Sequence, residues 1–295
     1  MTATLTPIPP TPERALVAAD SAEDRLIAQW LHGRSLHTQA AYRTAWRAFR
    51  ACCTAPLDHV TLADLQAWAD QLAGCELAAA SQALRLTALK SLLTFGHTLG
   101  VLPVNAGAAL RVPGRRSRLA ERILPEADVH RLLALETQPR NHALLRLLYA
   151  SGLRVSEATA LRWRDLQPAG DAGQVTVWGK GEKERTVRLP AGVFAELLRL
   201  RGDASGDAPV FRSRKRGGKL SSSQAERIVR AAAQRAGIMA PVSPHWLRHA
   251  LASHSLDRGC PIHVLQQTLG HSSLATTSRY SHARPGDSAG LYVAV

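Results

Sequence analysis

The stretch Ser243-Pro-His-Trp-Leu-Arg-His-Ala250 determines how the rest of this 295-residue sequence is interpreted. Proline is favoured in the first turn of a helix, so we expect a helix to begin at Pro244. His245 and Arg248 are then three positions apart and share one face of that helix. Such a basic pair is common on positive surfaces, so it indicates a function only together with other motifs.

Three other segments stand out in the same half of the chain. Gly152-Leu-Arg-Val-Ser-Glu157 lies between two short apolar runs, and Gly179-Lys-Gly181 lies in a turn. Leu269-Gly-His271 is followed nine residues later by Tyr280. Each segment alone has an ordinary explanation, namely an ion pair at the surface, a hairpin tip in solvent or a tyrosine packed in a core. Their order and spacing carry the information.

In that order and spacing, the sequence resembles the tyrosine recombinase (phage integrase) family over nearly its whole length. Thr38-Gln-Ala-Ala-Tyr-Arg43 resembles the opening helix of the family's core-binding domain. The length and the two-domain layout, without an added arm-binding domain in front, are most similar to the bacterial Xer subgroup. The positions that match the family's catalytic pattern are Arg154, Lys180, His245, Arg248, His271 and Tyr280.

The resemblance implies a strand-exchange reaction in which a phosphodiester bond is broken and its energy is kept in a covalent intermediate. Tyr280 is the implied nucleophile, which gives a 3′-phosphotyrosine and a free 5′-hydroxyl. A phenol has an unperturbed pKa of about 10, so positive neighbours are needed to favour the phenolate. Lys180 is the implied donor of a proton to the leaving 5′ oxygen.

The remaining motif residues would stabilise charge on the reacting phosphate. Arg154 and Arg248 are expected to hold the non-bridging oxygens in fork geometry. His245 and His271 would add hydrogen bonds, and His245 is the candidate base for the tyrosine proton. Glu157 would orient Arg154, with a plain surface pair as the alternative. Because side chains neutralise the charge, we expect no metal and no cofactor.

The hydrophobic pattern predicts a mainly α fold with a small antiparallel β element. Tyr42, Trp46 and Phe49 form one apolar helical stripe, whereas the β-type runs Val175–Trp178 and Arg185–Leu189 flank the turn that carries Lys180. The expected parts are a flexible tail at 1–20, a helical core-binding (SAM-like) DNA-binding domain at 21–110, a basic linker at 111–122, a catalytic domain at 123–280 and a tail at 281–295. For residues 111–122, the alternative to a linker is a surface loop within one large domain.

The charge predicts a polyanionic partner. There are 37 Lys and Arg against 23 Asp and Glu, and the net charge is +14. Residues 1–110 are neutral in sum, so the whole excess lies in residues 111–295. Only five of the basic residues are lysines, and arginine suits forked contacts with phosphate. A merely solubilising surface is the alternative; with the resemblance, double-stranded DNA is the expected partner.

A basic stripe lies beside the apolar stripe of the first domain. Arg43, Arg47 and Arg50 repeat at helical spacing, and we expect them to contact the duplex. The other candidates for DNA contact are Arg85, Lys90, Arg115, Arg116, Arg118, Arg227 and Arg230.

Several classes of protein are disfavoured by the sequence. The cysteines lack the C-x-x-C spacing of a zinc site and are expected to be reduced. No cationic start is followed by an apolar run, and no apolar stretch reaches about 18 residues, so we expect neither a secretory signal nor a membrane span. A cytoplasmic, nucleoid-associated protein is expected.

The Xer resemblance implies four protomers acting on two DNA recombination sites. A second related recombinase and a DNA-translocase activator are further candidate partners. The implied role is resolution of chromosome or plasmid dimers, and hence a part in chromosome partition and cell division. The alternatives are an integrase or transposase of a mobile element, a catalytically inert architectural DNA-binding protein and a type IB topoisomerase-like relaxase.

The C-terminal tail departs from the Xer pattern, in which a helix docks on a neighbouring subunit. Pro285, Gly286 and Gly290 oppose a helix. We therefore expect an extended tail whose apolar end, Leu291 to Val295, docks in a groove of its own chain or of a neighbour.

Overall fold

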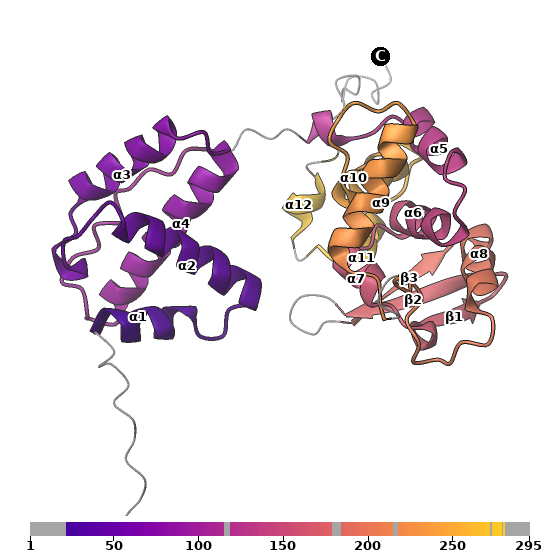
Figure 1. Ribbon diagram of the computed structural model, residues 1–295, viewed down its shortest axis with the longest axis horizontal. Helices are drawn as coiled ribbons and strands as arrows, with labels where there is room; N and C mark the ends of the chain where they lie inside the picture. The colour runs from indigo at the N-terminus through magenta and orange to yellow at the C-terminus, as the bar shows by residue number, and fades with distance from the viewer. Residues whose placement is uncertain are drawn as a thin grey trace, which may run out of the picture. The chain divides into compact units, whose positions relative to one another are not determined.

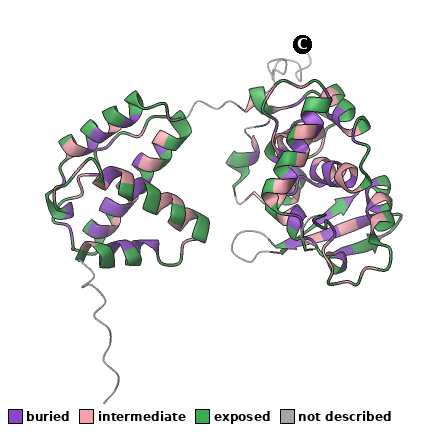
Figure 2. Cartoon of the chain, in the orientation of Figure 1, coloured by how far each residue is buried: buried purple, intermediate pink, exposed green. Residues whose placement is uncertain are grey.

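The computed structural model describes residues 22–114, 119–178, 184–214, 218–271, 273–278 and 280. The chain divides into two compact units, Met1–Arg116 and Ser117–Val295, each with its own hydrophobic core (Figures 1 and 2). The boundary falls inside the expected linker. The expected N-terminal tail, the C-terminal tail and the arginines at 115, 116 and 118 lie outside the described residues.

The first unit is helical, and its longest described helix packs against the other three. Contacts join α4 to α1, α2 and α3. At the start of α3 Thr61 and Asp64 form a capping box: the Asp64 amide donates to Thr61 Oγ1, and Asp64 Oδ2 accepts from the Thr61 amide. The bounds are α1 Ala22–Leu31, α2 Leu36–Arg50, α3 Leu62–Gly74 and α4 Ala79–Thr98, with a 3-10 turn at Leu57–His59.

Aromatic side chains fill the core of this unit. Phe49 is completely buried and meets Trp68 edge to face, with the ring centroids 5.3 Å apart. Trp46 lies on the same helical face, and its ring centroid is 6.0 Å from that of Phe49. Tyr42 is partly buried and stacks on Trp30 at 5.0 Å. The predicted apolar stripe of α2 is therefore confirmed.

The second unit surrounds the apolar helix α6. This helix contacts α5, α7, α8, α10 and β3, and it lies in the middle of the unit in Figure 1. Leu144, Leu145, Leu147 and Leu148 are fully buried along it. The helices are α5 Glu126–Ala134, α6 Pro139–Ser151, α7 Val155–Ala160, α8 Ala191–Arg201, α9 Ser222–Arg235, α10 Pro244–Asp257, α11 Ile262–Leu269 and α12 Leu274–Ser278, with 3-10 turns at Ala120–Arg122 and Trp163–Asp165.

The β element has one strand more than the sequence indicated. Its order is β1 (Leu166–Ala169), β2 (Ala172–Trp178) and β3 (Glu184–Leu189), all antiparallel. β1 pairs Leu166 with Val175 and Ala169 with Ala172 across a tight turn. Four residues with a proline give almost no alternating signal, so this edge strand is defined by its pairing with β2. The expected hairpin of β2 and β3 is confirmed.

Gly152 lies at the end of α6, where two of the motifs identified in the sequence come close together. It has φ +61°, in the left-handed region that glycine adopts without strain. A Cβ atom there would lie 2.7 Å from the Cδ2 atoms of both Leu251 and Leu269. The close approach of α6 to α10 and α11 therefore requires glycine, and it places Arg154 beside the C-terminal end of α11.

Candidate active site

The structure gathers five of the six expected catalytic residues in the second unit. Arg154 directly precedes α7, His245 and Arg248 lie on α10, His271 follows α11 and Tyr280 follows α12. The sixth, Lys180, lies outside the described residues, in the connection between β2 and β3.

Arg248 is the buried centre of this group, with only 4% of its surface exposed. It donates from Nη1 to the carbonyl oxygen of Gly152 and from Nη2 to that of Leu269, at 2.6 Å. These carbonyls belong to the C-terminal ends of α6 and α11, where helices lack internal donors and carry partial negative charge. Two helix ends therefore compensate the burial of one guanidinium.

The pKa of Arg248 falls to about 10, first because the group is buried and then because Arg154 is also positive. This value leaves the guanidinium charged at neutral pH. A permanent buried cation beside solvent-accessible Arg154 makes the site attractive to an anion such as phosphate.

His271 is neutral, and its tautomer follows from its partners. Its pKa falls to about 4, first by burial and then through the positive charges of Arg248, Arg154 and Arg185. An arginine can only donate, so His271 Nε2 accepts from Arg248 Nη2, 3.1 Å away. The ring proton must then lie on Nδ1, which donates to Thr277 Oγ1 at 2.9 Å.

Tyr280 is buried, with 4% of its surface exposed, and its hydroxyl contacts a histidine that sequence reasoning missed. Tyr280 Oη lies 2.7 Å from Nδ1 of His249. The His271 ring is parallel to the tyrosine on the other side, with centroids 6.5 Å apart. The signal was present in the sequence, because His249 follows His245 by one helical turn and shares its face.

His245 is exposed in the first turn of α10, and its ring centroid is 6.4 Å from that of His249. Partial desolvation by the surrounding chain lowers its pKa, and the charges of Arg248 and Arg154 lower it further. His249, not His245, is the histidine whose hydrogen bond to the tyrosine hydroxyl is seen. The base role of His245 stays a prediction, and this hydrogen bond makes His249 a second candidate for it.

Glu157 holds Arg154, and the pair is more than a surface contact. The Glu157 side chain is 8% exposed and accepts from Arg154 Nη1 at 2.9 Å and from the Arg154 amide at 2.7 Å. It also accepts two hydrogen bonds from Arg185, which the sequence analysis did not single out. Burial alone would raise the pKa of Glu157, but the hydrogen bonds from both arginines outweigh it and lower that pKa.

The expected DNA-contacting side chains divide into two groups. Arg43 and Arg47 on α2, and Arg227 and Arg230 on α9, are exposed, while Arg85 on α4 is partly buried. These side chains are placed where a duplex could reach them.

Arg50 and Lys90 are instead engaged within the first unit. Arg50 donates to the carbonyls of Cys53 and Ala55 and pairs with Glu23 at 3.2 Å. Lys90 donates to the carbonyls of Ala108 and Leu110. Both cations stabilise the unit's own loops, and their expected DNA contacts stay predictions. The pattern of charges could not reveal this, because the carbonyl partners carry no sequence signal.

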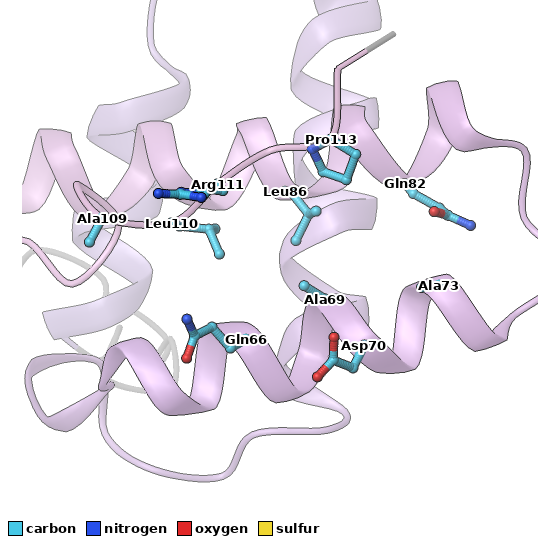
Figure 3. Close-up of a pocket in the computed structure, with 10 residues that line it drawn as sticks. All are labelled: Gln66, Ala69, Asp70, Ala73, Gln82, Leu86, Ala109, Leu110, Arg111 and Pro113. Carbon is cyan, nitrogen blue, oxygen red and sulfur yellow. The ribbon is translucent and has the colours of Figure 1, made fainter. Parts of the chain in front are cut away.

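A pocket of about 320 Å³ lies in the first unit, between α3, α4 and the segment that follows them (Figure 3). Gln66, Asp70, Gln82 and Arg111 line it together with small and apolar residues. None of the expected catalytic residues lines it. In the described part of the chain, no cluster of three or more His, Cys, Asp or Glu side chains could hold a metal ion. None of the described helices is long and apolar enough to cross a bilayer.

Known protein families match both units of the chain. Residues 122–286 match the phage integrase family, and residues 29–97 match the phage integrase N-terminal SAM-like domain. Tyrosine recombinase XerC of Pelobacter propionicus is 36% identical over 265 residues, covering 84% of this chain and 85% of that protein. Tyrosine recombinase XerD of Rhizobium meliloti is 36% identical over 237 residues, covering 74% and 75%.

Among solved structures, a lambda integrase dimer bound to a COC′ core site is similar, with a TM-score of 0.73 over 90% of this chain and 77% of that one. Its sequence is 20% identical, so this likeness concerns the fold. The chain belongs to the phage integrase family. Within that family it is a Xer-like tyrosine recombinase.

Proposed function

We propose that this site-specific recombinase breaks and rejoins DNA through a covalent bond between Tyr280 Oη and a DNA 3′-phosphate. The observation that carries the proposal is the buried, charged Arg248, hydrogen-bonded to His271 with Tyr280 stacked beside that ring. Membership of the recombinase family supports the same conclusion.

Arg154 and Arg248 would stabilise the negative charge that develops on the non-bridging oxygens. The Arg154 side chain is 37% exposed, so its fork is accessible to a phosphate, while Glu157 fixes it from behind. Arg248 is held by two helix ends and cannot reorganise freely. Hydrogen-bond donors that are already fixed in position stabilise the charge of a transition state strongly. The loss of one such donor raises the activation free energy by roughly 3–4 kcal/mol.

The nucleophile needs a proton acceptor, and His249 Nδ1 is in position to provide it. The proton of Tyr280 Oη passes to His249, the phenolate oxygen attacks phosphorus, and the bond from phosphorus to O5′ breaks. The leaving O5′ keeps the electron pair of the broken bond and receives a proton. Donation of this proton is the role proposed for Lys180. Because Tyr280 is buried, its hydroxyl has to become accessible to the scissile phosphate when DNA binds. Rejoining is the reverse sequence, with the 5′-hydroxyl as nucleophile.

The partner is a double-stranded DNA recombination site, contacted through Arg43, Arg47, Arg227 and Arg230. We propose a tetramer on two sites, with a second related recombinase and a DNA-translocase activator as further partners. The role is resolution of chromosome or plasmid dimers in the cytoplasm, at the nucleoid. The names of the XerC and XerD relatives, which match most of this chain, support this over a mobile-element integrase.

A nicked duplex tests the chemistry. DNA selected from random sequence by binding is nicked beside the scissile position, so that the cleaved end diffuses away and the covalent complex accumulates. The wild type should give an adduct on denaturing gels, and Tyr280→Phe should give none. Tyr149→Phe is the matched control, since Tyr149 is a partly buried tyrosine that bonds His254. An adduct that survives Tyr280→Phe, or no adduct on any bound site, would overturn the proposal.

The cellular role needs a different substrate. A plasmid dimer with two copies of the selected site should be resolved to monomers. Both DNA strands should be exchanged between the two copies of the site. Resolution that occurs only between unlike sites would assign the chain to integration instead.

A further inference from the structure

Arg185 is a charged residue on the inward face of a β-strand. Along β3 it alternates with exposed residues and shares its face with buried Val187 and Leu189. Its side chain is only 11% exposed. A guanidinium in such a position is tolerated only when several acceptors satisfy it, so its partners indicate what it holds in place.

The partners of Arg185 lie on two other segments of the unit. Nη1 donates to Glu157 Oε1 at 3.0 Å and Nη2 to Glu157 Oε2 at 2.8 Å, a two-bond fork that fixes the carboxylate in orientation as well as distance. Nε donates to the carbonyl of Thr268 at 3.1 Å. One side chain thus joins β3 to α7 and to the last turn of α11.

Both of these segments carry groups of the candidate active site. Glu157 Oε1 also accepts from Arg154 Nη1, so Arg154 and Arg185 share one oxygen. Thr268 lies three residues before His271. The connecting Gly270 has φ +63°, and a Cβ atom there would lie 3.0 Å from Arg185 Cδ. The turn that leads to His271 is therefore packed directly on Arg185.

We propose that Arg185 is a positioning residue, which fixes Glu157, and through it the Arg154 guanidinium, against the end of α11 that carries His271. The inference rests on the function proposed above for Arg154 and His271.

Charge explains why loss of Arg185 would affect Arg154. The carboxylate of Glu157 is almost completely buried and is shared between two guanidinium groups. Without Arg185, Glu157 keeps its negative charge but loses two hydrogen bonds. The side chain of Arg154 can satisfy it by turning both of its terminal nitrogens toward the carboxylate. That rotation would draw the fork away from the position where it meets a phosphate.

A second arginine on the same strand offers a matched control. Arg188 lies in the outward register of β3, is exposed, and donates to the carbonyl of Ala169. This hydrogen bond goes to β1, a strand that carries none of the expected catalytic residues. Arg185→Met and Arg188→Met therefore remove the same side chain from one strand, and they differ in what that side chain held.

The first experiment compares these variants in single-turnover cleavage of the nicked duplex at saturating protein. Displacement of a reacting group by about 1 Å costs about 10²-fold in rate, so Arg185→Met should lose about that factor. Its dissociation constant for DNA should stay at the wild-type value. Arg188→Met should cleave at the wild-type rate. Equal rates for the two variants would overturn the inference.

The second experiment separates positioning of Arg154 from general damage. In a duplex whose scissile phosphate carries a neutral methyl group in place of one non-bridging oxygen, less charge needs neutralising. On this duplex, the loss of cleavage rate caused by Arg154→Met or by Arg185→Met, relative to wild type on the same duplex, should be about tenfold smaller. If the deficit of Arg185→Met is the same on both duplexes, Arg185 acts through general structure and the inference is wrong.

Two further variants keep the test open if Arg185→Met does not fold. Arg185→Lys retains the charge but has no fork, and Glu157→Gln retains the shape but has no charge. For both variants, the loss of cleavage rate relative to wild type should be smaller on the duplex with the neutral, methylated phosphate. A smaller loss in neither variant would also contradict the proposal. If the wild type forms no adduct at Tyr280, the proposed function fails and takes the inference with it. If the wild type and Arg188→Met both react, only the inference is at stake.

Discussion

The hydroxyl of Tyr280 lies 2.7 Å from Nδ1 of His249, on the helix that also presents Arg248 to the same site. The neighbouring rings continue on both sides, with His245 beyond His249 and His271 parallel to the tyrosine. The candidate nucleophile therefore has an imidazole in hydrogen-bond contact. His245 and His249 are separate residues of α10, so substitutions can distinguish their roles experimentally.

The first prediction concerns that contact. His249→Gln keeps a side chain that can hydrogen-bond Tyr280 but removes the base. General-base catalysis contributes about 10²–10⁴-fold, so single-turnover adduct formation should slow by about 10²-fold or more with unchanged DNA binding. His263→Gln is the control, since His263 is an exposed histidine on α11. Wild-type kinetics for His249→Gln would assign the base role elsewhere.

The second prediction is a dependence of stability on pH through His271. Its pKa is about 4 in the folded protein and 6.5 as the unperturbed value for the unfolded chain. Between these values the unfolded state binds more protons. The free energy of unfolding should therefore fall as the pH drops from 6.5 to 4, and His271 should contribute no further loss below that. Urea midpoints measured across this window should depend less on pH in His271→Gln than in wild type, whereas His263→Gln should keep the wild-type slope.

The third prediction concerns the glycine that ends α6. Gly152→Ala forces an alanine to φ +61°, at about 1–2 kcal/mol, and pushes its Cβ against Leu251 and Leu269, which adds about 1–3 kcal/mol. Gly237→Ala has a similar φ of +69° but meets no atom within 4 Å. Denaturation should show the larger loss for Gly152→Ala, with slower cleavage as well. Equal losses would mean that backbone strain is the whole effect.

The fourth prediction separates two arginines on α2. Arg47→Ala should weaken DNA binding and reduce the slope of log K against log salt by about one, because one phosphate contact is lost. Arg50→Ala should leave that slope unchanged and lower the melting temperature, because Arg50 holds the carbonyls of Cys53 and Ala55. A lower salt slope for Arg50→Ala would restore it as a DNA contact.

The parts of the site that follow local rules could be predicted from the sequence. His245 and Arg248 share a helical face by their spacing, and Glu157 meets Arg154 one turn away. Both depend on contacts within four residues. The order of the motifs then identified the family, which local patterns alone could not do.

The features that could not be predicted from the sequence depend on contacts between segments far apart in the chain. Arg185 reaches Glu157 across 28 positions, and Lys90 reaches the carbonyls of Ala108 and Leu110, which any sequence could supply. The sequence did contain a signal that Arg185 faces inward, since it shares one face of its strand with Val187 and Leu189. It contained no signal that Glu157 would be the partner of Arg185. Likewise, β1 is defined by its pairing with β2 and has little alternation of its own.

The way Arg248 closes the ends of α6 and α11 bears on how such an enzyme can lose its activity in evolution. Replacing Arg248 would leave the carbonyls of Gly152 and Leu269 buried without donors, at about 1–3 kcal/mol each, so the fold itself selects for this arginine. A change of Tyr280 to phenylalanine removes only a hydroxyl. Descendants that retain DNA binding but no longer cut are therefore expected to have lost the tyrosine first and to carry the arginine as a relic.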